Sequence, residues 1–291
     1  ILWVRGQTRE LVTDSLDFAG IRPLQTELDL SAQFTRLNLT LPESESLRTG
    51  KIENSYLEPE WLGSLQKMAA ARVRLDSSYG PTKPDEWGYL FGSGFPFYPI
   101  DERGLPLPML ESPFVLHGAN LTPKRLSLLL QGSEDFYHQP ITIDVPATIM
   151  TDQPSAGLML AFRDVVSLAE KHDHWLTTSG EFLDFLSARR RSVLTSQWSP
   201  TSRKLTVNVN ILGARSKTLE KGAFPSVAVP RTYKSEEMES IVLDGNELSI
   251  RTLGTSGDGE ELIIEPGAGR HSIEIQYKEP AEIKIVDDED E

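Results

Sequence analysis

The spacing of apolar residues changes near residue 200, and this change constrains the fold of the 291-residue chain more than any other feature. Before it, short apolar stretches alternate with amphipathic ones, which is typical of strand–helix units around a parallel sheet. After it, apolar residues recur at every second position, as in Lys204-Leu-Thr-Val-Asn-Val-Asn210, and turn signals such as Asp244-Gly245 separate these stretches. The sequence therefore predicts an α/β part followed by a small antiparallel β-sandwich.

The first part divides into about seven strand–helix units. Strands are expected at Ile1–Val4, Ile21–Leu30, Lys51–Tyr56, Arg72–Asp76, Leu107–Phe114, Pro140–Met150 and Trp175–Thr178. Helices are expected at Thr8–Ala19, Glu58–Ala71, Thr122–Leu130, Ser155–His172 and Gly180–Arg190. Thr178-Ser-Gly-Glu181 has the polar cap and early acid of a helix start. Ser77–Pro106 is rich in Gly, Pro and aromatic residues, so we expect a long ordered loop at the rim of a site.

Composition excludes several classes of protein. The formal net charge of −14 argues against nucleic acid as a partner, because phosphate-binding proteins carry clustered Lys and Arg. The absence of cysteine excludes disulfides, thiolate metal sites and a cysteine nucleophile. No apolar run approaches the roughly 20 residues of a membrane-spanning helix, so no transmembrane segment is expected.

The two ends of the sequence carry further expectations. Because Ile1 is the first residue, we expect the numbering to start inside a longer gene product. Residues 280–291 end in Asp287-Asp-Glu-Asp-Glu291, and such a run of like charges is expected to be a disordered, solvated tail. Asn38-Leu-Thr40 and Asn120-Leu-Thr122 could be glycosylated in a secretory pathway.

Several stretches together resemble the polysaccharide deacetylase (NodB-homology) superfamily, in a version with a C-terminal β-sandwich. They are Arg74-Leu-Asp-Ser-Ser-Tyr-Gly80, Gly88-Tyr-Leu-Phe-Gly-Ser-Gly-Phe-Pro-Phe97 and Thr177-Thr-Ser-Gly-Glu-Phe-Leu-Asp-Phe185. The strand pairs near Ser240–Gly245 and Pro266–Tyr277 also look like the appended module of that family. The resemblance implies a distorted (β/α)7-type barrel, which we assign to residues 1–195, and a β-sandwich at residues 196–279.

Members of that family remove acetyl groups from glycans with a divalent metal held by an aspartate and two histidines. A second aspartate serves as base and a late histidine as acid. This sequence has no His-x-x-x-His, no Asp-Asp pair after its first strand, and no histidine in Asp144-Val-Pro-Ala-Thr-Ile-Met-Thr-Asp152, where the late histidine is expected. Either the metal site is degenerate and no cofactor is bound, or the ligands of a zinc site lie upstream of Ile1.

A candidate cleft combines carboxylates at predicted strand ends, where barrel active sites lie, with aromatic residues of the long loop. Its residues are Asp76, Tyr79, Trp87, Tyr89, Tyr98, Glu111 and Asp144. Aromatic rings stack on the apolar faces of sugars, and carboxylates accept hydrogen bonds from hydroxyl groups. The alternatives are that Asp76 caps a turn while the aromatic residues pack the rim, or that two carboxylates form a glycosidase acid–base pair.

Other motifs are weaker indications of a function. His172-Asp-His174 resembles a metal-ligand cluster, but its position at a predicted helix end favours capping of carbonyl groups. His138 is expected on a surface loop. The absence of a Gly-x-Ser-x-Gly elbow, a Walker loop and a dinucleotide fingerprint excludes serine hydrolases and nucleotide-binding enzymes of those types. The sequence predicts no metal ligand and no catalytic residue.

Three functions remain open. The leading hypothesis is a secreted or cell-surface pseudoenzyme that binds a polysaccharide or serves as a structural component. The second is an active metal-dependent polysaccharide deacetylase whose ligands precede Ile1. The third is a subunit of an extracellular assembly, in which the sandwich and the acidic tail contact other copies or other chains.

Overall fold

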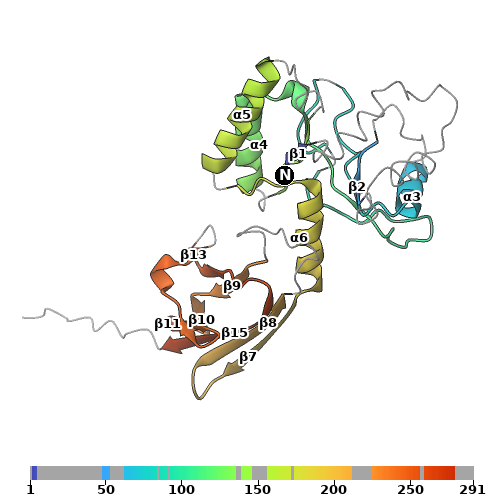
Figure 1. The fold of residues 1–291 in the computed structure, drawn as a ribbon. Coiled ribbons are helices and arrows are strands. Elements are labelled where there is room, and N and C mark those ends of the chain that lie inside the picture. Colours follow the sequence, from blue (N-terminus) through green and yellow to red (C-terminus); the bar gives the residue numbers. More distant parts are fainter. Residues whose placement is uncertain are drawn as a thin grey trace, which may run out of the picture. The chain divides into compact units, whose positions relative to one another are not determined.

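A computed structural model describes residues 2–4, 48–52, 62–83, 85–90, 92–135, 139–145, 156–171, 174–211, 225–255 and 259–278. The chain divides into two compact units, Ile1–Leu183 and Asp184–Glu291 (Figure 1). Several expectations lie outside the described residues. They concern His138, His172, the glycosylation site at Asn38, the helix Thr8–Ala19, the strand Ile21–Leu30 and the tail at residues 280–291.

The N-terminal unit contains two small parallel sheets of three strands each. In the first, β1 (Leu2–Val4) and β5 (Leu116–His117) flank β6 (Ile143–Val145). In the second, β2 (Thr49–Gly50) and β4 (Leu110–Glu111) flank β3 (Leu75–Asp76). All four pairings are parallel, so the carboxyl ends of the three strands lie at one edge in each sheet.

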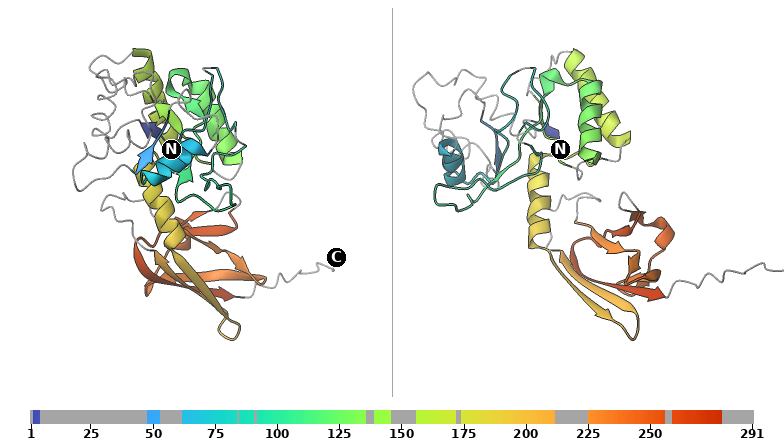
Figure 2. Two further views of the ribbon diagram at one scale, coloured as in Figure 1. Left: turned by 90° about the vertical axis from the view of Figure 1, so that its right-hand side faces the viewer. Right: turned by 180° about the vertical axis from the view of Figure 1, so that it is seen from behind.

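Four α-helices occur among the described residues. They are α3 (Gly63–Ala70), α4 (Pro123–Asp135), α5 (Ala156–Lys171) and α6 (Ser179–Arg191). Helix α4 buries Leu126, Leu129 and Leu130 in a core with Leu116 of β5 and Ile143 of β6. Helices α4 and α5 lie side by side (Figure 2). A 3-10 turn, η2 (Gly118–Asn120), precedes α4.

The predicted helix start at Thr178 is confirmed. The Thr178 hydroxyl accepts a hydrogen bond from the Glu181 amide at 3.3 Å, and the Thr178 amide donates to the Glu181 carboxylate at 3.1 Å. This reciprocal pair satisfies amides that a helix start leaves without partners. Because Glu181 draws both Thr177 and Thr178 into the cap, the expected strand Trp175–Thr178 does not form.

The predicted distorted (β/α)7-type barrel is wrong. The described parallel strands are two or three residues long, they form two separate three-stranded sheets, and the four helices are short. Proline gives one physical reason, since Pro108 and Pro113 lie inside the expected strand Leu107–Phe114 and have no amide to donate to a ladder. Only Leu110–Glu111 of that stretch is a strand.

The C-terminal unit is a curled antiparallel half-barrel sheet with a smaller antiparallel sheet beside it (Figure 2). The strands of the large sheet are β7 (Val193–Ser199), β8 (Lys204–Ile211), β10 (Thr232–Tyr233), β11 (Glu236–Leu243), β12 (Asn246–Glu247) and β15 (Gly269–Lys278), in the order β10-β11-β15-β8-β7 with β12 paired to β11. The small sheet has the order β13 (Gly254–Thr255), β14 (Glu261–Ile264) and β9 (Val227–Pro230), and a 3-10 turn η4 (Ile250–Thr252) precedes it. The period-two stretch Lys204–Asn210 thus lies in β8, and the period-two stretches at 240–245, 261–265 and 271–277 coincide largely with β11, β14 and β15.

Both sheets of the C-terminal unit contribute to one apolar core. Val207 of β8 and Ile273 of β15 are buried in it with Val229 of β9 and Leu262 of β14. Tyr277 is also buried there, and its hydroxyl donates to the Pro230 carbonyl at 2.7 Å. The Trp198 ring lies 5.0 Å from the Tyr233 ring and 5.8 Å from the Tyr277 ring, as centroid distances. An aromatic cluster thus closes one end of this core.

No helix in the described part of the chain is long and apolar enough to cross a membrane, as the sequence predicted.

Candidate functional site

Titratable side chains gather at the carboxyl ends of the parallel strands in the N-terminal unit. Asp76 ends β3 and Glu111 ends β4, and the two residues face each other in register. His117 ends β5 and faces Asp144 of β6, while Lys51 directly follows β2. Carboxyl ends of parallel strands are where α/β proteins commonly place their sites, so we treat these five residues as the candidate site.

Asp76 and Glu111 form a fully buried carboxyl pair. Burial raises the pKa of Glu111 well above its usual range, and the charge of Asp76 raises it further. Burial also raises the pKa of Asp76, although the hydrogen bond from Glu111 opposes that rise. Two carboxylates in contact cannot both ionise cheaply, so the pair holds one proton, with Glu111 as its donor.

Backbone and hydroxyl groups fix the outer oxygens of this pair. Ser78 donates from its hydroxyl to Oδ1 of Asp76 at 2.7 Å and accepts from the Ile52 amide at 2.8 Å. The Tyr79 amide donates to Oε1 of Glu111 at 3.1 Å. Oδ2 of Asp76 and Oε2 of Glu111 are buried and have no hydrogen-bond partner in the geometry of the described residues.

Lys51, Asp144 and His117 form a second group, which is less deeply buried. The Lys51 ammonium pairs with Oδ2 of Asp144, and the same oxygen lies 3.3 Å from Nδ1 of His117. The side chains of Lys51, Asp144 and His117 are 4%, 11% and 27% exposed. His117 is therefore the member of the group that solvent reaches most.

The second nitrogen of His117 is also engaged. Nε2 lies 2.8 Å from the carbonyl oxygen of Pro81, and a carbonyl can only accept, so Nε2 carries a proton. Both nitrogens thus lie near oxygen atoms of the protein. In this arrangement His117 links the loop at Pro81 to β6.

Phe114 packs against the Lys51–Asp144–His117 group. Its ring centroid lies 4.0 Å from the Lys51 ammonium and 4.8 Å from the His117 ring centroid. The other neighbour of this ring is Gly80, where a Cβ atom would approach Phe114 to 2.2 Å. Only glycine fits at this position, because Phe114 is buried and has no room to retreat.

A loop of residues 93–107, here named the aromatic arm, extends from the strand that carries Glu111. Phe97 and Glu111 exchange two backbone hydrogen bonds, of 2.9 and 2.8 Å, and the Leu107 amide donates to the Pro99 carbonyl at 2.7 Å. At the tip, Oδ1 of Asp101 accepts from the amides of Arg103 and Leu105 at 2.9 and 2.8 Å. The backbone of the arm is therefore well fixed.

Apolar side chains of the arm face solvent although its backbone is fixed. Phe95, Phe97 and Tyr98 are 41%, 40% and 36% exposed, and Ile100 and Leu105 are more exposed still. Adjacent exposed apolar side chains on a soluble protein surface commonly mark a binding site. The arm thus presents three exposed aromatic side chains on a hydrogen-bonded backbone.

The seven residues predicted from sequence fall into four environments. Asp76 and Glu111 form the buried pair, and Asp144 belongs to the Lys51–His117 group. Tyr79 contributes its amide to the pair, and burial raises the pKa of its phenol to about 12. The remaining members split between core and surface. Trp87 and Tyr89 are partly buried and pack against the core that contains the leucines of α4. Tyr98 is exposed on the arm.

Sequence reasoning missed Lys51, His117, Phe95 and Phe97. His117 directly follows the apolar stretch Phe114–Leu116, so a search for polar residues after apolar stretches could have included it. Lys51 follows Thr49–Gly50, which carries no such signal. Phe95 and Phe97 lie inside the predicted rim loop, in Gly94-Phe-Pro-Phe97. Their exposure depends on the pairing of the arm with β4, which the local sequence does not specify.

The described residues do not fit the divalent metal that the family resemblance implies. Asp144 already pairs with the Lys51 ammonium, which would repel a cation, and the Asp76–Glu111 pair is closed by its own proton. Within the described ranges, no group of three or more His, Asp or Glu residues could hold a metal ion.

The carboxyl pair is also too close for a glycosidase. Such enzymes keep their two carboxyl groups at least about 5 Å apart on either side of the bond that is cleaved. Asp76 and Glu111 are joined by a hydrogen bond and are sealed from solvent, so no sugar fits between them.

No family model matches this chain, and no curated protein matches it.

Proposed function

We propose that this protein binds the neutral face of a polysaccharide with the aromatic arm, outside the cell or at its surface, as a deacetylase-like pseudoenzyme. The observation that carries the proposal is the set of Phe95, Phe97 and Tyr98, which are exposed while their backbone is fixed against β4. Because the backbone under these rings is already fixed, little backbone entropy is lost when a ligand stacks on them.

The polar groups behind the arm support binding over catalysis. Asp76 and Glu111 satisfy each other, and both nitrogens of His117 face protein oxygens. A catalytic acid or base needs a proton or a lone pair directed at the substrate. These residues instead hold the loops at Ser78, Tyr79 and Pro81, next to the strand that carries the arm.

Isothermal titration calorimetry with N-acetylglucosamine tetramer and with cellotetraose tests this proposal on the full chain. We expect saturable binding of one or both, weakened about 3–10-fold by Phe97→Ala, since one aromatic contact contributes about 0.5–1.5 kcal/mol. Trp175→Ala is the matched control, because Trp175 is an exposed aromatic residue outside the arm. If neither sugar binds, or if both variants weaken binding equally, the arm is not a sugar platform.

The active deacetylase with ligands upstream of Ile1 remains a prediction. Acetate release from N-acetylglucosamine tetramer, measured on the full gene product with and without zinc, would replace our proposal by that alternative. An assembly subunit would instead show a molar mass above that of the monomer in size-exclusion chromatography with light scattering.

A further inference from the structure

Strand β7 forms one edge of the large sheet in the C-terminal unit (Figure 1). It pairs with β8 over all seven residues, from Val193 opposite Asn210 to Ser199 opposite Lys204, without a bulge. Its other side has no strand partner within the described ranges. Natural sheets protect such edges with charges, prolines or bulges, and Val-Leu-Thr-Ser-Gln-Trp-Ser has none of these devices.

The hydrogen bonds of the sheet determine which backbone groups of β7 face this free side. The Tyr277 amide of β15 donates to the carbonyl of Arg203, directly before β8, at 3.0 Å. Antiparallel ladders alternate, so the odd-numbered residues of β8 bond to β15 and its even-numbered residues bond to β7. By the same alternation Leu194, Ser196 and Trp198 direct their amides and carbonyls away from β8.

The side chains of these three residues lie on the inner face of the sheet. Their neighbours on β8 are the buried core residues Leu205, Val207 and Val209. Leu194 is nevertheless 54% exposed, and Ser196 is exposed as well. The free edge therefore combines unpaired backbone groups with an apolar side chain that a further strand would cover.

The sequence of β7 is complementary to itself in an antiparallel pair centred on Ser196. Leu194 then lies opposite Trp198 of a second copy on the inner face, and Ser196 lies opposite Ser196. Thr195 lies opposite Gln197 on the outer face. Apolar residues thus meet apolar residues and polar residues meet polar ones, except in the end pair. The register also brings outward backbone groups of the two copies together, whereas a shift by one residue would not.

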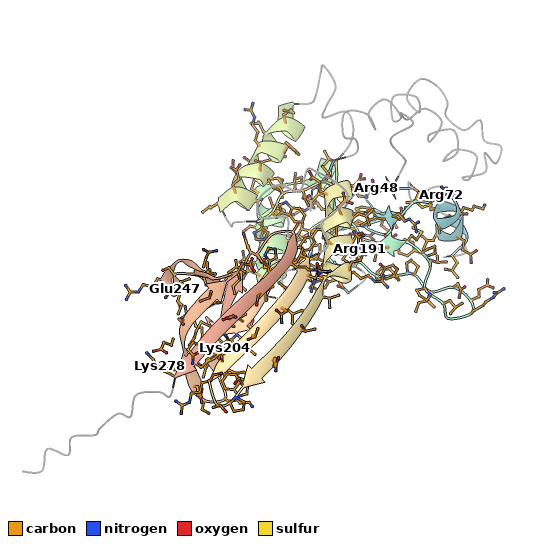
Figure 3. All side chains as sticks on the ribbon, turned by 60° about the horizontal axis from the view of Figure 1, so that its bottom comes forward. Arg48, Arg72, Arg191, Lys204, Glu247 and Lys278 are labelled. Carbon is orange, nitrogen blue, oxygen red and sulfur yellow. The ribbon has the colours of Figure 1, made fainter. Side chains whose placement is uncertain are left out.

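The charges near β7 permit this pairing. The strand itself has no charged residue, and Arg191 and Lys204 lie at opposite ends of it (Figure 3). Lys204 pairs with Glu274 at 2.6 Å, and Arg203 pairs with Glu236 at 3.5 Å. The hairpin end that would approach Arg191 of a second copy therefore carries compensated charges. An uncharged strand gives no charge complementarity to an acidic or basic peptide, which favours a second copy as the occupant.

We propose that β7 pairs antiparallel with β7 of a second copy, about a two-fold axis at Ser196, so that the large sheet continues from one copy into the other. The pairing ends at two chains, because each β7 covers the edge of the other. One short strand per copy buries less than the roughly 1,200 Å² of a stable interface, so the dimer is weak and reversible, with a Kd of about 1–100 µM.

Sedimentation velocity of the full chain at increasing concentration tests the dimer. We expect the weight-average mass to rise from that of one chain toward that of two. Ser196→Pro should weaken the dimer at least about tenfold, because it removes an outward amide and leaves the bonds to β8 intact. Leu194→Ser should weaken it about 3–10-fold. Leu160→Ser is the matched control, since Leu160 is similarly exposed but lies on α5.

Cysteine trapping tests the register, and it remains informative if Ser196→Pro does not fold. The described residues contain no native cysteine, and the sequence has none. Ser196→Cys places two cysteines opposite each other at a Cα distance of about 5.5 Å, which a disulfide can span. Under mild oxidation it should form a disulfide-linked dimer at least about tenfold faster than Asn246→Cys, an exposed control on β12.

Three results would overturn the proposal. The first is a monomer at every concentration, and the second is an equal trapping rate for the two cysteine variants. The third is a dimer that Ser196→Pro and Leu194→Ser leave unchanged, because the contact would then lie elsewhere. A mass above that of two chains would also contradict it, since paired β7 edges leave none for a third copy. None of these outcomes depends on whether the aromatic arm binds sugar.

Discussion

The two units of this protein are stabilised in different ways. The N-terminal unit has parallel strands of two or three residues and buries Asp76, Glu111, Lys51 and Asp144 among them. The C-terminal unit has antiparallel strands of up to ten residues around a core of aliphatic side chains and one tyrosine. In the C-terminal unit, long ladders of backbone hydrogen bonds surround an apolar core. In the N-terminal unit the strands are short, and hydrogen bonds and ion pairs of buried polar side chains connect the loops that follow them. The candidate site therefore lies in the unit that depends on polar side chains.

The sharpest way to test this contrast is to remove one partner of the buried ion pair. Lys51→Met leaves the Asp144 carboxylate without its ammonium partner, and we expect a loss of about 3–5 kcal/mol in the free energy of unfolding. Adding Asp144→Leu should recover most of that loss, because the unpaired charge is then gone. Urea denaturation followed by circular dichroism measures both variants. A loss below about 1 kcal/mol for Lys51→Met would show that the pair is not buried as described.

The matching change in the C-terminal unit is apolar. Ile275 is fully buried on β15, and Ile275→Ala should cost about 2–5 kcal/mol through lost burial and the cavity left behind. This loss should hardly vary with salt or with pH between about 5 and 8, because no charged group is involved. A strong dependence on either would contradict the contrast between the units.

Gly80 tests the packing around the candidate site. Gly80→Ala places a Cβ atom inside the ring of Phe114, and we expect a loss of about 1–3 kcal/mol in the free energy of unfolding. Gly132→Ala is the control, because Gly132 lies inside α4 with no atom near its added Cβ, and it should gain about 0.5–1 kcal/mol. Thermal unfolding of the two variants should therefore shift in opposite directions.

The smallest expected effect is a pH dependence. Folding raises the pKa of Glu111, so its protonated form stabilises the protein fully below the unfolded pKa and that stability is lost as pH rises through the folded pKa. Glu111→Gln keeps a hydrogen-bond donor toward Asp76 without a titrating proton, and should flatten the fall in stability as pH rises above the unfolded pKa of a glutamate. Glu102→Gln, an exposed residue of the arm, should leave the slope unchanged. An equal slope in all three proteins would refute the shared proton.

Local signals in the sequence predicted local structure well. Thr178 and Glu181 specified a helix start that the structure confirms, and the period-two stretches lie largely in β8, β11, β14 and β15. The barrel failed because apolar stretches were counted as strands even where Pro108 and Pro113 prevent a ladder. The spacing of apolar residues alone does not show whether an extended segment pairs with another strand.

The candidate site was predictable only as positions at strand ends. Asp76, Glu111 and Asp144 could be placed there from their neighbours in the sequence. The contact between Lys51 and Asp144 joins residues 93 positions apart, and the contact between Asp76 and Glu111 depends on the register of two strands. Such long-range pairings follow from tertiary packing, which no local pattern encodes.

Trp198 gives the two units separate optical signals. Of the five tryptophans in the chain, it alone belongs to the C-terminal unit, and it lies within 6 Å of the rings of Tyr233 and Tyr277. Excitation of those tyrosines should therefore transfer energy to Trp198 only while the aromatic cluster is intact. A variant with its other four tryptophans changed to phenylalanine would report, by fluorescence alone, when the C-terminal unit unfolds.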